Sequence, residues 1–449
     1  MKRTIDYFLL QWKNRKERKP LLLRGARQVG KTYAARELGK TFATFIEINL
    51  ETNSMAREIL SKDLDVQRIL FQLSELTRQD IKPGSTLLFI DEIQRSPQAI
   101  IALRYFFEQV PQLHVIAAGS LLDFAIEQVG VPVGRVTYLY MYPLSFLEFL
   151  SAMGHDRWVK SIISDSPLFQ ELHDTIMQLI GQYLAIGGMP AAINKWRQEK
   201  NSREVKLVHS DILNVYVEDF GAYSKKHQIK YLSLVFNKSM EQLSRKFMFS
   251  RLREYRKREL DPAIELLEKA GIIYQVFRNV AQGIPIGAGV ELSDFKIIFL
   301  DVGLVQALLR YDLSSWFLNP PLESFINKGE VVEAFIGQEL LAYSDPISKE
   351  KLYYWRKSDN SSQAEVDYLV QLKDHIAPVE VKSGTSSRLR SLHEFLKFHP
   401  HTKFGVRFSP HNESKENSIL TYPLYAVAKL LIEYNDELKE ALRSLVEEK

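Results

Sequence analysis

The stretch Leu21–Thr32, LLLRGARQVGKT, constrains the fold of this chain more than any other. Three leucines lead into Gly25, and residues 25–32 fill the pattern G-x-x-x-x-G-K-[ST] without a mismatch. A buried strand followed by such a turn points backbone N–H groups into one concavity, and the next helix adds its positive N-terminal end. Gly25 and Gly30 permit the turn and a close approach of backbone to a ligand. The sequence therefore predicts a phosphate-binding loop between a strand and a helix.

Each end of this loop has an expected role. We expect Lys31 to reach the β- and γ-phosphates of a nucleotide and the Thr32 hydroxyl to ligate Mg²⁺. The predicted cofactors are thus ATP and Mg²⁺. The residues expected to hold the nucleotide are Gly25, Ala26, Arg27, Gln28, Val29, Gly30, Lys31 and Thr32.

A second nucleotide signature is the apolar run 86–90, which ends in Asp91 and Glu92. Continuous apolar runs are typical of fully buried parallel strands. The carboxyl ends of such strands are where open α/β sheets bind ligands. We expect Asp91 to hold the Mg²⁺ shell and Glu92 to polarise the attacking water as a general base.

Two further residues are candidates for the same site. Ser120 follows the predicted strand 113–118 and is either a sensor of the γ-phosphate or the N-cap of the next helix. Arg135 opens the predicted strand 136–141. It either stabilises transition-state charge, in its own chain or in a neighbour's, or is a structural arginine in a loop.

Residues 226–305 predict helices followed by a β-hairpin, an order that indicates a small winged-helix module. The segment 251–258, RLREYRKR, carries five basic residues just before the second long helix. In such folds this region can meet a DNA backbone. Winged helices also serve purely as structural lids, so both interpretations stay open.

The second candidate site is a predicted hairpin within residues 364–384. A two-residue turn at Lys373–Asp374 would place Asp367 opposite Glu380, with Lys382 two residues on and on the same face. Facing carboxylates repel each other, and a bound Mg²⁺ would resolve that repulsion. Lys382 would then orient or deprotonate the attacking water. The alternative is a solvated edge strand with alternating polar residues.

This D…E-x-K arrangement resembles that of the restriction-endonuclease-like nucleases, in which a helix glutamate often completes the site. Glu333, four residues after Gly329, suits that role. The expected metal ligands of this site are therefore Glu333, Asp367 and Glu380.

The motifs together resemble the prokaryotic AAA-like (ASCE) P-loop ATPases that carry a C-terminal domain of unknown function with a nuclease-like fold of the PD-(D/E)xK type. The resemblance implies ATP hydrolysis by Lys31, Thr32, Asp91 and Glu92, and a winged-helix segment between the two ends. The matching segments are GARQVGKT (25–32), TLLFIDEIQ (86–94), AAGS (117–120), GR (134–135), YPLSFLEFL (142–150), YLAIGGMP (183–190), FLDVGL (299–304), VVEAFIGQEL (331–340) and EVDYLV…VEVKSG (365–384).

The predicted fold class is α/β, because strands and helices alternate from residue 21 onward and so predict a parallel sheet covered on both faces. A chain of 449 residues is too long for one core. The predicted domains are an AAA-like P-loop ATPase core at 1–150, a helical lid at 151–225, a winged-helix module at 226–305 and a restriction-endonuclease-like α/β domain at 306–449.

The amino-acid composition limits the binding partners and the chemistry that this chain can have. The net charge of +4 permits a nucleic-acid partner without demanding one, and the absence of cysteine excludes disulfides, zinc thiolate sites and thiol catalysis. The N-terminus does not read as a signal peptide, and no run reaches the roughly 20 apolar residues of a membrane span. We expect a cytoplasmic protein without a membrane partner, and a homo-oligomer or ring is its candidate assembly.

Two functions compete. In the first, ATP fuels a DNA-processing protein whose C-terminal domain engages or cuts DNA. In the second, the chain is a nucleotide-dependent switch or scaffold, and a catalytically inactive nuclease-like domain binds protein partners. A nucleotide kinase is disfavoured, because Asp91 and Glu92 form a hydrolase arrangement and no acceptor pocket is apparent.

Overall fold

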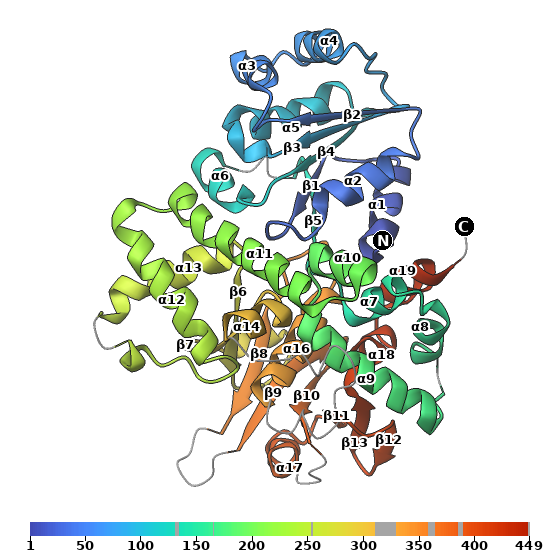
Figure 1. Ribbon diagram of the computed structural model, residues 1–449, viewed down its shortest axis with the longest axis vertical. Coiled ribbons are helices and arrows are strands. Elements are labelled where there is room, and N and C mark those ends of the chain that lie inside the picture. Colours follow the sequence, from blue (N-terminus) through green and yellow to red (C-terminus); the bar gives the residue numbers. More distant parts are fainter. Residues whose placement is uncertain are drawn as a thin grey trace.

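Two β-sheets joined by a layer of helices form the molecule (Figure 1). The computed structural model describes residues 1–130, 134–164, 166–252, 255–309, 329–357, 364–384 and 389–447. The phosphate-binding loop belongs to the first sheet and the predicted D…E-x-K hairpin to the second.

The first sheet has the strand order β2-β3-β4-β1-β5, and all its pairs are parallel. Helices α1 and α2 pack on one face, and α3 to α6 pack on the other. This is the predicted parallel sheet covered on both faces. Its elements are α1 (Thr4–Asn14), β1 (Leu21–Arg24), α2 (Lys31–Gly39), β2 (Thr44–Asn49), α3 (Ser54–Lys62), α4 (Val66–Thr77), β3 (Thr86–Asp91), α5 (Pro97–Gln109), β4 (His114–Ala118), α6 (Leu122–Val129) and β5 (Thr137–Tyr140).

A helical layer separates the two sheets (Figure 1). The long helix α11 crosses the molecule beneath the first sheet (Figure 1). The helices of this layer and of the following segment are α7 (Phe146–Ala152), α8 (Asp156–Ile162), α9 (Gln170–Ile186), α10 (Pro190–Glu199), α11 (Ser202–Tyr223), α12 (Ile229–Glu241) and α13 (Lys257–Lys269).

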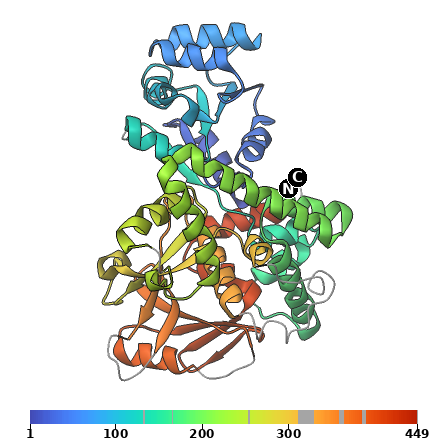
Figure 2. The same ribbon diagram turned by 60° about the vertical axis from the view of Figure 1, so that its left-hand side comes forward.

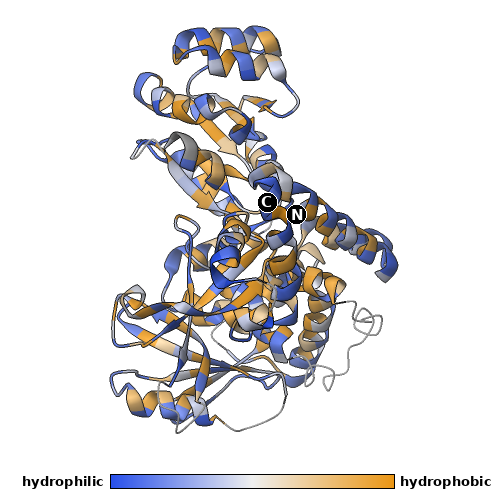
Figure 3. Cartoon of the chain, turned by 90° about the vertical axis from the view of Figure 1, so that its left-hand side faces the viewer, coloured by the Kyte–Doolittle hydropathy of each residue, from blue (hydrophilic) through white to orange (hydrophobic). Residues whose placement is uncertain are grey.

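The second sheet is mixed and has eight strands in the order β12-β13-β11-β10-β9-β8-β6-β7. Figure 3 shows hydrophobic segments concentrated along its strands. Its elements are β6 (Ile273–Asn279), β7 (Val290–Phe299), α14 (Val302–Leu308), α16 (Gly329–Ala342), β8 (Leu352–Arg356), β9 (Glu365–Leu372), β10 (His375–Val381), α17 (Arg390–Phe398), β11 (Gly405–Ser409), β12 (Ser414–Glu416), β13 (Ile419–Pro423), α18 (Val427–Ile432) and α19 (Asp436–Val446).

The hairpin predicted as the wing of a separate module is part of this second sheet. Its strands β6 and β7 pair with each other as expected, but β6 also pairs in parallel with β8. The physical reason is that an isolated two-stranded hairpin leaves unpaired edges, which β8 covers on one side. The proposed boundary at residue 305 therefore divides a single continuous sheet.

The two ends of the chain lie close together (Figure 2). The last helix, α19, packs against α1 and also against α7 and α8 (Figure 2). The C-terminal segment thus begins in the second sheet and ends against the first helix.

Gly303 marks a tight junction between α14 and the end of α9. An ideal Cβ at Gly303 would lie 2.6 Å from backbone atoms of Ile186 and Gly187. Beside it, the buried Asp301 accepts hydrogen bonds from the backbone N–H groups of Gly188 at 2.5 Å and Leu304 at 3.1 Å. Close backbone packing therefore excludes a side chain at Gly303.

We expect Gly303→Ala to destabilise the protein by about 1–3 kcal/mol, because rigid backbone must move to admit the methyl group. Thermal unfolding followed by circular dichroism measures it. Gly221→Ala is the control, since Gly221 lies within α11 with open space around it, and alanine there should stabilise the helix slightly. Equal unfolding temperatures for wild type and Gly303→Ala would contradict the close contact.

Candidate functional site

The loop 25–32 connects β1 to α2 and has the backbone of a phosphate nest. Gln28 and Gly30 both have positive φ, 66° and 103°, which turns successive N–H groups toward one side. The Lys31 ammonium lies over this loop and donates to the carbonyls of Gly25 at 2.9 Å and Ala26 at 2.8 Å. Burial lowers the pKa of Lys31 to about 8, while Glu92 and Asp91 oppose the shift. A phosphate in the loop would give this buried cation a counter-charge.

The predicted Mg²⁺ ligands lie together at the carboxyl end of the sheet. The Thr32 hydroxyl donates to Asp91 Oδ2 at 2.9 Å. These residues come from α2 and β3, and β4 runs between β3 and β1 in the sheet. A hydroxyl and a carboxylate oxygen are ligands that Mg²⁺ accepts, so the donor set fits the ion.

Three side chains at the ends of β3 and β4 surround the expected position of the γ-phosphate. Glu92 accepts a hydrogen bond from Gln94 Nε2, while Gln94 Oε1 and Ser120 Oγ are buried without a partner. The N-cap of α6 is Leu121, so the N-cap interpretation of Ser120 is wrong. Sequence reasoning quoted Gln94 within a motif but gave it no role. Free buried polar atoms here suit a ligand that completes their hydrogen bonds.

Arg135 does not lie at the phosphate loop of its own chain. It precedes β5, which runs parallel to β1, so it lies at the amino edge of the sheet, opposite the loop. Its Nε donates to Glu108 Oε1 at 2.9 Å. A role on the nucleotide of the same chain is therefore wrong, and a role in a neighbouring chain stays a prediction.

Residues outside the matched loop hold its backbone from two sides. From α11, the Tyr216 hydroxyl donates to the Arg27 carbonyl at 2.8 Å, and Asp219 pairs with the Arg27 guanidinium at 2.7 Å. From the N-terminus, Arg3 Nη1 donates to the Val29 carbonyl at 3.1 Å. Sequence reasoning missed these contacts, since they join segments far apart in the chain.

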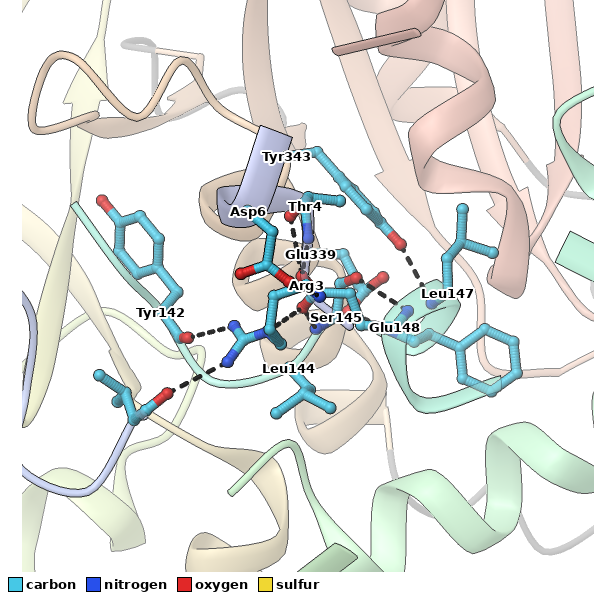
Figure 4. A network of polar contacts seen from close by, with 12 residues as sticks. Arg3, Thr4, Asp6, Tyr142, Leu144, Ser145, Leu147, Glu148, Glu339 and Tyr343 are labelled. Carbon is cyan, nitrogen blue, oxygen red and sulfur yellow. Dashed lines mark hydrogen bonds and ion pairs between the residues drawn. The ribbon is translucent and has the colours of Figure 1, made fainter. Parts of the chain in front are cut away.

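Arg3 is the start of a buried polar network (Figure 4). Its guanidinium also donates to the Tyr142 carbonyl at 2.8 Å and pairs with Glu148 at 3.0 Å. Glu148 belongs to the capping box of α7 with Ser145. The next backbone N–H, that of Phe146, donates at 2.9 Å to Glu339 of α16. Hydrogen bonds therefore lead from the phosphate loop to a helix of the second sheet.

The D…E-x-K hairpin has the predicted register. Leu372 pairs with His375 and Tyr368 with Val379, so the next position places Asp367 opposite Glu380. Both strands lie inside the eight-stranded sheet, and Glu380 is 5% exposed. The interpretation as a solvated edge strand is wrong.

Lys296, which sequence reasoning missed, enters this site from β7. Its ammonium lies 3.0 Å from Glu333, 2.6 Å from Glu365 and 3.9 Å from Asp367, and the residue is 2% exposed. Within the described ranges, no three acidic or histidine side chains form a group that can hold a metal. The predicted ligand trio of Glu333, Asp367 and Glu380 is therefore not assembled, because Lys296 pairs with Glu333.

Two carboxylates of the site still fit a cation. Glu380 Oε1 binds Lys382 at 2.5 Å, while its Oε2 is buried without a partner. Asp367 Oδ2 accepts the Val381 N–H at 2.7 Å. Burial and the neighbouring Asp367 raise the pKa of Glu380 to about 7, and burial raises the pKa of Asp367 as well. A divalent ion would satisfy the free oxygen and relieve the repulsion.

Comparison with known proteins divides the chain into three parts. A family described as an AAA domain matches residues 17–150, and domains of unknown function, DUF8612 and DUF4143, match residues 177–315 and 328–427. No curated protein matches the sequence.

Two solved structures are similar at low identity. The Walker-type ATPase PABY2304 of Pyrococcus abyssi is 14% identical, with a TM-score of 0.44 over 68% of this chain and 95% of that one. PCH-2 of C. elegans is 13% identical, with a TM-score of 0.27 over 44% of this chain and 61% of its own.

The AAA match contains the phosphate loop and the Asp91–Glu92 pair. The N-terminal part is therefore a P-loop ATPase domain, as the resemblance implied. The other two matches assign no activity. Among the described helices, none alone has the length and hydropathy to cross a membrane, and only the bent pair α9 and α10, at 118°, meets those limits when joined.

A pH prediction follows from Glu339, whose pKa burial raises to about 8 from 4.5. A carboxyl with a raised folded pKa favours the folded state while protonated, and this contribution is lost as pH rises from about 4.5 through 8. We expect Glu339→Gln to unfold at the same temperature as wild type near pH 4 and roughly 2 °C or more above it at pH 9.

Differential scanning calorimetry across this pH range measures the difference. Glu416→Gln, on the exposed strand β12, is the matched control and should follow wild type throughout. A constant offset between Glu339→Gln and wild type from pH 4 to pH 9 would refute the titration of Glu339.

Proposed function

We propose that this chain is a Mg²⁺-dependent ATP hydrolase whose nucleotide state controls a C-terminal nuclease-like domain that acts on DNA. The observation that carries the proposal is the series of polar contacts from the phosphate loop to α16, from Val29 through Arg3 and Glu148 to the start of α7 and Glu339. The same helix α16 carries Glu333 of the Lys296 cluster.

At the ATPase site, the roles follow from position. Lys31 neutralises the β- and γ-phosphates, and Thr32 with Asp91 would hold Mg²⁺, which supplies further charge neutralisation when bound. Glu92 accepts the proton of the attacking water. Its hydrogen bond from Gln94 fixes the carboxylate in place.

Ser120 completes this site as the sensor of the γ-phosphate. Its buried hydroxyl has no partner among the described residues, so a phosphate oxygen would be its acceptor. Hydrolysis removes that oxygen from reach, and the hydroxyl then loses its hydrogen bond. Such a difference between nucleotide states is what a coupled conformational change requires.

At the second site, Asp367 and Glu380 would hold a divalent cation that polarises the phosphodiester, and Lys382 would orient the attacking water. Charge supports this assignment. When all its groups are ionised, the cluster has four carboxylates and two ammonium groups, and four minus two leaves two negative charges for a divalent cation. The carboxylates are Glu333, Glu365, Asp367 and Glu380, and the lysines are Lys296 and Lys382.

A second candidate function is the nucleotide-dependent switch with a catalytically inactive domain. The observation that favours it is Lys296, which already neutralises part of the acidic cluster without a metal. An acid pair can therefore persist in a binding domain, and its presence alone does not require catalysis.

We also propose an oligomeric assembly and a cellular location for this chain. Arg135 lies on the far edge from its own phosphate loop, a position from which it would act only on a neighbour's nucleotide, as in a ring. An ATP-dependent protein that acts on DNA would work in the cytoplasm.

We expect Glu92→Gln to lower ATP turnover by about 100-fold or more, because it removes the general base. Phosphate release measures turnover, and fluorescent-nucleotide titration measures affinity, which should change little. Gln67→Glu on α4, away from the loop, is the control. Unchanged ATP turnover in Glu92→Gln would contradict the assignment of Glu92 as the general base.

We expect Mg²⁺-dependent cleavage of linear, circular or branched DNA by wild type, with loss of cleavage in Glu380→Gln and an altered response to ATP in Lys31→Ala. Gel assays with and without ATP measure this. Glu416→Gln is again the matched control. ATP hydrolysis without cleavage of any of these DNAs would exclude the nuclease and leave the switch.

A further inference from the structure

Six exposed cations gather where the start of α12 meets the start of α13. The Tyr231 and Tyr255 rings from the two segments lie 5.0 Å apart, edge to face, and the Lys230 ammonium lies 4.7 Å and 5.2 Å from their centres. These contacts fix two segments, far apart in sequence, side by side. We call the six residues the basic surface: Lys225, Lys226, Lys230, Arg256, Lys257 and Arg258.

The charge of the basic surface is largely uncompensated. In the part of the chain that the structure describes, none of its six cations forms an ion pair with a carboxylate. The acids within the segments 225–231 and 255–261 are Glu259, which accepts from the Arg256 N–H and the Tyr231 hydroxyl, and Asp261, whose pKa is raised by burial while Lys257 opposes the shift. In these two segments, six cations minus two acids leave a net charge of +4.

A short stretch of sequence, from Lys246 to Arg256, links the carboxylate cluster to the basic surface. Lys246 forms a β-bridge with Lys296, the residue at the centre of that cluster. From there the chain passes through the exposed Arg251 toward α13, while Arg253 lies outside the described residues. One segment therefore leads from the second candidate site to the basic surface.

We propose that the basic surface binds the phosphate backbone of DNA and holds it for the second candidate site. This inference rests on the proposed function, which makes DNA the substrate there. When all its groups are ionised, the cluster has a net charge of −2 and repels phosphates, so cations elsewhere must supply the attraction.

The surface fits a nucleic acid better than a membrane. An interfacial helix places large apolar side chains next to its cations. Within residues 225–231 and 255–260, no large hydrophobic side chain is exposed. The cations instead surround two half-buried tyrosine rings, a combination found on surfaces that follow a nucleic-acid backbone.

The test is DNA binding by the full chain, measured as fluorescence anisotropy of a labelled duplex in EDTA, over a series of salt concentrations. The variant Lys257→Glu/Arg258→Glu reverses two charges at the start of α13, where acidic residues favour the helix and so preserve folding. We expect its affinity to fall at least about tenfold and its salt slope by about two, one for each lost phosphate contact.

The matched control is Arg15→Glu/Lys16→Glu, an equal charge change on the exposed loop after α1, which should bind like wild type. Lys225→Glu/Lys226→Glu tests the second segment and should weaken binding as well. Equal DNA affinity and equal salt dependence in the basic-surface variants and the control variant would overturn the proposal. Binding of wild type to phosphatidylserine vesicles, with none to the duplex, would overturn it too.

These outcomes are separable from the fate of the proposed function. Binding in EDTA requires neither hydrolysis nor cleavage, so DNA bound through the basic surface by a protein that cleaves nothing would keep this inference and remove the nuclease. Cleavage by a basic-surface variant that binds DNA as tightly as wild type would remove this inference and keep the nuclease.

Discussion

The buried guanidinium of Arg3 is the interaction on which the arrangement of the two halves depends. It donates to the phosphate-loop carbonyl of Val29 and to Tyr142, and it pairs with Glu148. Removing one partner of such a buried pair typically costs about 3–5 kcal/mol, because the other charge is left uncompensated. The loop that binds phosphate is therefore held by a residue from outside its own strand and helix, and a shift in either is felt by the other.

Helix α16 extends this dependence to the second sheet. Glu339 binds the backbone at the start of α7, and Glu333, two turns earlier, binds Lys296. Glu339 is buried and Glu333 is half-buried, and burial raises the pKa of each. A shift or rotation of α16 would break the hydrogen bonds of both glutamates at once. These bonds therefore make α16 a rigid link between the two sheets. Movement at the phosphate loop would displace both ends together.

The elements predicted from sequence were those with local signals. The G-x-x-x-x-G-K-[ST] loop, the run before Asp91 and the two-residue turn at residues 373–374 each fix geometry within a few residues, and the register at Asp367 followed from that turn. Lys296, Arg3 and Tyr216 act through partners more than twenty residues away in sequence. No periodicity or spacing marks such pairs, so only the tertiary structure reveals them.

The assignment of the β6–β7 hairpin to a separate winged-helix module was wrong for the same reason, because it depended on a long-range pairing that the sequence does not show. The sequence pattern of two helices followed by a hairpin predicts a winged helix whether or not a further strand pairs with the hairpin. The pairing of β6 with β8 cannot be recognised in the hairpin's own sequence. Once that pairing forms, β7 brings Lys296 into the acidic cluster, and the segment that bridges to β7 at Lys246 continues toward the start of α13. The strand of the predicted module that carries Lys296 and the strands that carry Glu365, Asp367 and Glu380 then belong to one sheet.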